Sequence, residues 1–128
     1  MDANEIINVI NHSIEKLDYA SARKYIEENL NLVNINKHLL IDNARSVLDY
    51  INDTLESGAQ PLTRQEVSLI YTINKHAMKF DVRALRMVIR DNPSLLIRQD
   101  IKHYFNEDAK TLLEGMNVIP KQSKQAII

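Results

Sequence analysis

The sequence predicts an all-α domain of six or seven helices, arranged as two pseudo-repeated units. Three observations support this prediction. Among 128 residues there are only 2 glycines and 3 prolines, too few turn formers for a β-rich fold. Apolar residues recur at three- and four-residue steps along most of the chain, which is the period of a helix buried on one side. A segment of the first half of the sequence is also similar to a segment of the second half that lies 63 residues later.

The repeated segment is residues 16–32, KLDYASARKYIEENLNL, which matches residues 79–95, KFDVRALRMVIRDNPSL. Each copy has the pattern of a helix, a corner containing Asp, and a second helix. Such units bury their apolar stripes against neighbouring units, so we expect a short α-solenoid or an irregular bundle. The identical pairs are Lys16/Lys79, Asp18/Asp81, Arg23/Arg86, Ile26/Ile89, Asn29/Asn92 and Leu32/Leu95.

Three helices are predicted in the first half. Asp2 caps the first, because its carboxylate can accept from the free amides of the first turn, and Asp18 caps the second. Residues 31–35 form a short connection. The third helix ends at Gly58, before the linker segment SGAQP. Its predicted buried stripe is Leu40, Ala44, Val47, Leu48, Ile51 and Leu55.

The second half begins at a capping box of Thr63 and Glu66. Asp81 caps the next helix, which is expected to end near Asn92, because the residue before Pro93 disfavours helix. A sixth helix is predicted from about 95 to 105, and a seventh starts at Asn106 and ends at Gly115. The buried face of the helix that follows the capping box is predicted to be Val67, Ile70, Ile73 and Ala77.

These elements form a single domain over residues 1–115, with pseudo-repeats at about 1–57 and 63–115, followed by a C-terminal tail at 116–128. The chain has no cysteine, so disulfides and thiolate metal sites are excluded. It shows no signal-peptide pattern and no apolar run of about 18 residues, which a membrane span requires. We expect a cytoplasmic protein of bacterial type that does not bind membranes.

Charge is divided unevenly along the chain. Residues 1–60 contain 5 Lys and Arg against 10 Asp and Glu, whereas residues 61–128 contain 11 against 7. The net charges are therefore −5 and +4. Such polarity can steer an ionic partner, or it can favour a homodimer that joins the acidic half of one copy to the basic half of another.

Residues 18–26, DYASARKYI, resemble the entry to the second helix of a tetratricopeptide-type hairpin. In such a hairpin a small residue lets two helices approach, and an apolar residue four positions later fills the gap. Ala22 and Ile26 match these roles in the first copy, and Leu85 and Ile89 match them in the second. The resemblance implies a concave groove for a peptide or a partner helix, and no catalysis.

Residues 76–87, HAMKFDVRALRM, are similar to a DNA-binding helix-turn-helix. Ala77 stands four residues before the turn residue Asp81, and Val82 follows it. The second helix of the motif would present Arg83, Arg86 and Arg90 on one exposed face that could enter a major groove. The simpler interpretation of the same three residues, which we favour, is a solvated face of a structural helix.

No motif for catalysis or cofactor binding is recognisable in the sequence. Its four histidines lack zinc-ligand spacing, and two glycines cannot form a phosphate-binding loop. We therefore expect no enzyme activity, no metal and no cofactor. The sequence favours a regulatory module that binds a protein or peptide, with a DNA-binding regulator as the alternative. Its predicted partner-binding residues are Arg83, Arg86, Arg90 and Arg98.

Overall fold

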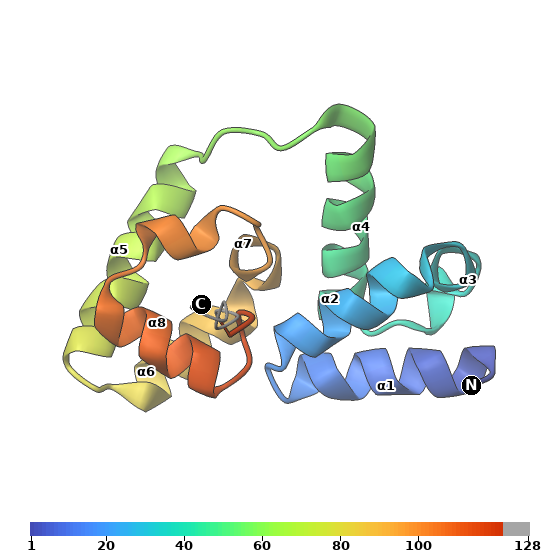
Figure 1. Cartoon of the computed structure of the whole chain (residues 1–128), viewed down its shortest axis with the longest axis horizontal. Coiled ribbons are helices and arrows are strands. Elements are labelled where there is room, and N and C mark those ends of the chain that lie inside the picture. Colours follow the sequence, from blue (N-terminus) through green and yellow to red (C-terminus); the bar gives the residue numbers. More distant parts are fainter. Residues whose placement is uncertain (122–128) are drawn as a thin grey trace, which may run out of the picture.

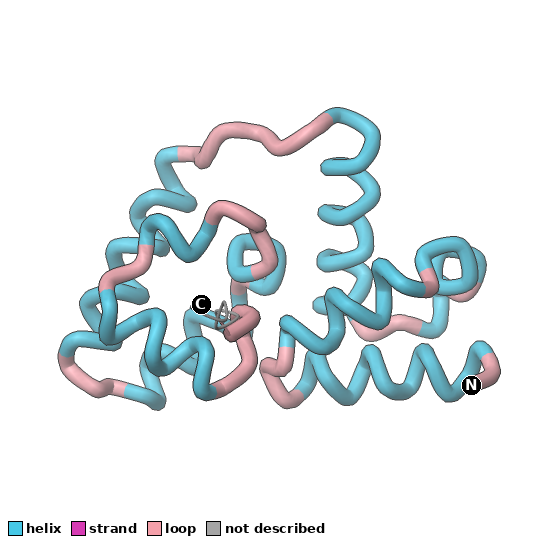
Figure 2. Tube along the Cα trace, in the orientation of Figure 1, coloured by secondary structure: helices cyan, strands magenta, loops and turns pink. Residues whose placement is uncertain are grey.

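The structure is a computed structural model that describes residues 1–121, all of which lie in helices or the loops between them (Figures 1 and 2). The predicted all-helical class is confirmed. The first half consists of α1 (Ala3–Glu15), α2 (Tyr19–Glu28), α3 (Leu30–Ile35), the 3₁₀ turn η1 (Lys37–Leu39) and α4 (Asp42–Ser57). The second half consists of α5 (Arg64–Met78), α6 (Val82–Asp91), α7 (Pro93–Leu96), the 3₁₀ turn η2 (Ile101–Tyr104) and α8 (Glu107–Gly115).

Local side-chain chemistry starts most of the long helices where the sequence predicts. Asp2 accepts from the Glu5 amide at 2.9 Å, and Thr63 and Glu66 form the predicted reciprocal capping box. Three further side chains cap helices by accepting from the amide three residues later, at 2.8–3.2 Å: Asp18, Asp81 and Asn106. Each cap satisfies an amide that has no partner inside its own helix.

The corners between α1 and α2 and between α5 and α6 have the same backbone. Leu17 and Phe80 lie in the left-handed region, with φ of 65° and 52°. The next residues are Asp18, with φ −84° and ψ 67°, and Asp81, with φ −83° and ψ 77°. In both corners the Asp amide donates to the carbonyl five residues earlier, that of Ser13 at 2.8 Å and that of His76 at 3.0 Å. We call residues 16–19 and 79–82 the first and second elbows.

A matched pair of asparagines fixes the start of the last helix in each half. Asn11 donates to the Leu39 carbonyl at 3.0 Å and accepts from the Ile41 amide at 2.9 Å. Asn74, 63 residues later, makes the same two bonds to Tyr104 and Asn106, also at 3.0 and 2.9 Å. The two halves therefore share an arrangement of α1 with α4, and of α5 with α8, that is held by the same side chain.

One continuous apolar core joins the halves, which lie side by side under the linker that connects α4 to α5 (Figure 1). At their junction the Tyr19 hydroxyl donates to the Ile89 carbonyl at 2.9 Å, and Asn43 of α4 donates to the Arg90 carbonyl at 3.0 Å. Ser94 of α7 donates to the Ser46 carbonyl of α4 at 3.3 Å. In each of these three bonds the acceptor is a main-chain carbonyl.

The helix count differs from the prediction, because the described residues contain eight α-helices. The connection predicted at 31–35 is largely the helix α3, and the helix predicted at 95–105 is two short elements separated by residues 97–100. Pro93 begins α7 at the first helical position, where its missing amide is not needed. The first half has the same order of elements, α3 followed by η1, but the second half contains two more residues between Asn92 and the start of its last helix than the first half contains after Asn29.

Three predictions about burial are wrong. Leu55 is 69% exposed and Val67 is 52% exposed, because both lie on turns of α4 and α5 that none of the described helices covers. The tail predicted from residue 116 starts too early, since Val118 and Ile119 are buried in the core. The rest of that predicted tail, residues 122–128, lies outside the described residues.

Candidate functional site

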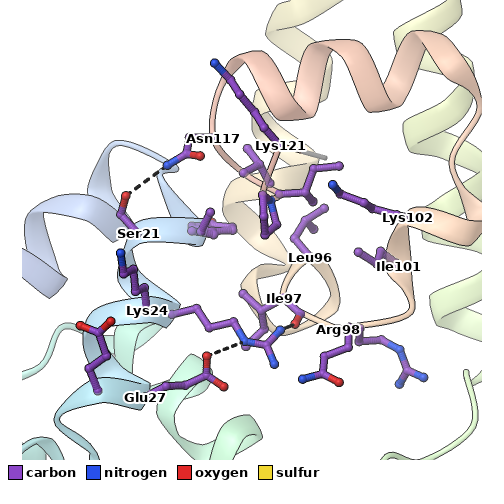
Figure 3. Close-up of a pocket in the computed structure, with 18 residues that line it drawn as sticks. Ser21, Lys24, Glu27, Leu96, Ile97, Arg98, Ile101, Lys102, Asn117 and Lys121 are labelled. Atoms are coloured by element: carbon purple, nitrogen blue, oxygen red, sulfur yellow. Dashed lines mark hydrogen bonds and ion pairs between the residues drawn. The ribbon is translucent and has the colours of Figure 1, made fainter. Parts of the chain in front are cut away.

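A groove lies where the two halves meet (Figure 3). One wall is α2, and the other is formed by the connection from α7 to η2 together with the residues that follow α8. The groove has a volume of about 860 Å³, which is within the range of about 300–1,000 Å³ for ligand sites. Segments far apart in the sequence therefore build one concave surface.

Two side-chain bridges hold the walls of the groove together. Asn117 follows α8 in the left-handed conformation, with φ of 59°. Its side-chain amide donates to the Asp18 carboxylate and, at 3.1 Å, to the Ser21 hydroxyl, while its carbonyl accepts from the Ala20 amide at 3.1 Å. Arg23 makes the second bridge, because its guanidinium donates to the Ile97 carbonyl across the groove (Figure 3).

The floor of the groove is apolar. Its buried members come from α2, α7, η2 and the segment after α8, and the largest of them are Tyr19, Leu96, Ile97, Ile101, Val118 and Ile119. Tyr19 is fully buried, and this burial raises the pKa of its hydroxyl, which remains a hydrogen-bond donor to the Ile89 carbonyl. The floor is thus a packed surface on which aliphatic or aromatic groups of a ligand could rest.

Cations outnumber anions around this floor. Glu27 and Glu28 are the anionic residues that line the groove. The lining cations are Arg23, Lys24, Arg98, Lys102 and Lys121. The side chains of Lys24 and Lys102 extend from opposite walls (Figure 3). The lining has a formal charge of +3 at neutral pH, so the groove is an attractive place for a carboxylate.

Several of these charges already have partners within the fold. Arg23 pairs with Glu27 at 3.2 Å, and Lys102 pairs with Glu114 at 3.5 Å. No ion pair forms at Lys24 or Lys121 within residues 1–121. These two exposed lysines are therefore the cations most available to a ligand.

The four arginines predicted to bind a partner do not form one surface. Arg83, Arg86 and Arg90 are exposed on α6, as predicted, but they lie outside the groove. Arg98 is 5% exposed and is held by Asp100, at 3.0 Å, and by the Gln60 carbonyl, at 2.9 Å. Its hydrogen bond to Asp100 raises the pKa of Arg98 and lowers that of Asp100. Arg98 therefore ties the linker to the second half and is not a free binding residue.

Sequence reasoning missed the residues that build the groove. Lys24 lies within the repeated segment but has Met87 as its counterpart, so the comparison of copies did not draw attention to it. Asn117 and Lys121 were assigned to the tail. A sign of structure was present there, since two aliphatic residues directly follow an asparagine, a residue type that tolerates the left-handed conformation at a helix end.

Within residues 1–121, no group of three or more His, Asp or Glu side chains is arranged to hold a metal ion. None of the described helices has the combined length and apolar character of a membrane span. Comparisons of the chain with protein-family models, with curated proteins and with solved structures give no match.

Proposed function

We propose that this protein is a cytoplasmic protein–protein interaction module that binds an acidic segment of a partner protein in the groove between its halves. The observation that carries the proposal is the combination of an apolar floor with an excess of cations around it. Apolar side chains of the bound segment would rest on Ile97, Ile101 and Val118. Its carboxylates would face Lys24 and Lys121.

The construction of the groove supports a binding role. Both bridges across it, from Asn117 and from Arg23, end on groups that belong to the scaffold, so the walls are fixed before a ligand arrives. A site that is formed in advance loses less conformational entropy on binding. Lys24 and Lys121 are exposed to solvent, where charges mainly increase the rate of association and the selectivity for oppositely charged partners.

Binding of short fluorescent peptides tests this function directly. The probes are a peptide in which Glu alternates with Leu and a matched peptide in which Lys replaces every Glu. We expect saturable binding of the acidic peptide and no saturable binding of the basic one. The affinity for the acidic peptide should fall as salt concentration rises, because the lysines at the edge of the groove are exposed. In the double variant Lys24→Glu/Lys121→Glu the affinity should fall at least about tenfold.

The matched control is Arg83→Glu/Arg90→Glu, which changes the net charge equally but outside the groove. It should bind the acidic peptide with nearly unchanged affinity. Equal binding of the two peptides, or an equal loss of affinity in both double variants, would show that the groove is not the site.

A second candidate function is sequence-specific DNA binding by α6. The observation in its favour is that α5 and α6 are joined by a three-residue corner, with Arg83, Arg86 and Arg90 exposed along α6. The control variant Arg83→Glu/Arg90→Glu separates the two functions, because it should abolish DNA binding and preserve peptide binding. A gel-shift series against salt measures the first effect. Sequence-selective binding whose affinity falls steeply with salt would favour DNA.

A further inference from the structure

The same face of the second helix is covered in one half of the molecule and bare in the other. In the first half, Tyr19, Ala20 and Arg23 of α2 all bond to the second half. Their counterparts 63 residues later are Val82, Arg83 and Arg86 of α6. Val82 is 40% exposed and both arginines are exposed, whereas Tyr19 is fully buried. We call Phe80, Val82, Arg83 and Arg86 the open face.

Phe80 is the clearest sign that this face lacks a partner. A left-handed conformation is unfavourable by about 1–2 kcal/mol for a residue with a Cβ atom, and glycine or asparagine is the usual choice. Leu17 adopts it in the first elbow, but Leu17 is 2% exposed, so burial offsets the strain. Phe80 adopts it while 68% exposed. Within residues 1–121, Phe80 therefore lacks the nearly complete burial that offsets the strain at Leu17.

The polar groups of the open face also match groups that are bonded in the first half. The Ala20 amide donates to the Asn117 carbonyl, and Asp18 accepts from the Asn117 side chain as well as from its own helix. The matching Arg83 amide has no acceptor within residues 1–121, and Asp81 accepts there from the Ala84 amide of its own helix. The Arg83 amide and the Asp81 carboxylate thus remain as the donor and the acceptor that correspond to the groups bonded to Asn117 in the first half.

We propose that the open face is a docking surface for the end of a helix in a partner protein, one that ends as α8 does, with a left-handed asparagine followed by aliphatic residues. The asparagine side chain donates to Asp81, and its carbonyl accepts from the Arg83 amide. The aliphatic residues cover Phe80 and Val82. Arg86, identical in type to Arg23, reaches a main-chain carbonyl of the partner as Arg23 reaches that of Ile97.

Charge and topology narrow the choice of occupant. The open face contains Arg83 and Arg86, and the residues next to Phe80 in the second elbow are Lys79 and Asp81, all of them exposed. Three cations against one anion favour an acidic partner. A second copy of the chain does not have its own Asn117 turn available, because that turn is bound to its first elbow. The open face is separate from the groove, which lies at the junction between the two halves, so the proposal does not depend on binding in the groove.

The test uses a synthetic peptide of residues 106–121 that carries Thr111→Lys. Its helix is fixed by a lactam that joins the Glu107 carboxyl group to the introduced lysine amine, and both positions are exposed in α8. The peptide is titrated into the full isotope-labelled chain, and backbone amide shifts are followed by NMR. We expect shifts at residues 80–86 and not at residues 17–20, since the first elbow is already occupied. Replacing the asparagine of the peptide with alanine should weaken binding at least about tenfold.

The variant Phe80→Asp should also weaken peptide binding at least about tenfold, whereas the control Leu55→Asp, at another exposed apolar residue, should leave it unchanged. If Phe80→Asp lowers the melting temperature, Phe80→Asn replaces it, because asparagine tolerates the left-handed conformation. The proposal is overturned by shifts confined to the first elbow, by equal binding to both variants, or by no shift at about 1 mM peptide, an affinity near the weakest that a specific contact provides. Sedimentation of the free chain as a dimer dependent on Phe80 would likewise overturn it in favour of a second copy.

Discussion

The two elbows of this molecule have the same backbone and opposite surroundings. Leu17 and Phe80 share the left-handed conformation, and Asp18 and Asp81 share their role as helix caps. Yet the first elbow is buried against the second half, and the second elbow is open to solvent. The comparison shows that the corner is a local structure that forms without tertiary cover. It also distinguishes the residues that form the corner from the residues that pack at the junction between the halves.

The residue types follow this division. Residues that make the same bonds within their own half are identical, as at the capping Asp18 and Asp81 or at Asn11 and Asn74, which bind the start of the last helix. Tyr19 instead bonds across the junction through its hydroxyl, and its counterpart is Val82. Substitutions at paired positions can therefore measure how much stability comes from the junction and how much from the corner.

The largest difference is expected between Tyr19→Ala and Val82→Ala. Removal of a fully buried aromatic side chain lowers the free energy of unfolding by about 3–5 kcal/mol, and here it also removes the Tyr19 hydroxyl as a donor to the Ile89 carbonyl, which keeps its bond from the Asn92 amide. Val82→Ala should change it by less than about 1 kcal/mol, because Val82 is 40% exposed. Urea denaturation followed by circular dichroism measures both. Similar losses would mean that the open face already has cover in solution.

A smaller difference is expected when each left-handed residue is replaced by glycine. Leu17→Gly removes a buried side chain and relieves backbone strain, and together these effects should lower the free energy of unfolding by about 2–4 kcal/mol. Phe80→Gly relieves the same strain without loss of burial, but glycine gains freedom in the unfolded chain, so the net change should stay within about 1 kcal/mol. The two midpoints of denaturation give the comparison. A loss at Phe80 as large as that at Leu17 would remove the argument that Phe80 is retained for a partner.

Those parts of the fold that depend on local chemistry were predictable from the sequence. Helix starts at Asp18, Thr63, Asp81 and Asn106 follow from capping, which needs only three or four neighbouring residues. The end of α4 at Gly58 follows in the same way. Burial was less predictable, because it depends on which faces the other helices reach. Leu55 and Val67 continue apolar stripes of their helices and are nevertheless exposed.

The candidate site was largely beyond sequence reasoning, for physical reasons. The groove exists only because the turn after α8 returns to α2, a contact between residues nearly 100 positions apart. Arg98 looked like one more exposed cation, since a sequence does not show that Asp100 and the Gln60 carbonyl enclose it. The exposed arginines of α6 were predictable, because the identity of Arg23 and Arg86 placed them on a repeated helix. The difference between covered and open faces could be recognised only in the structure.

The smallest difference is expected at the asparagines that fix the last helix of each half. Asn11→Ala and Asn74→Ala each remove one donated and one accepted bond at 2.9–3.0 Å, so each should lower the free energy of unfolding by about 1–3 kcal/mol. The two losses should agree within about 1 kcal/mol, because the bond that the Asn106 side chain donates at 3.3 Å goes to the main-chain carbonyl of Asn74, which Asn74→Ala retains. Asn→Asp at either position is the matched control, since aspartate keeps the acceptor and removes the donor. If one alanine variant were neutral and the other destabilising, the equivalence of the two halves would hold for the elbows alone.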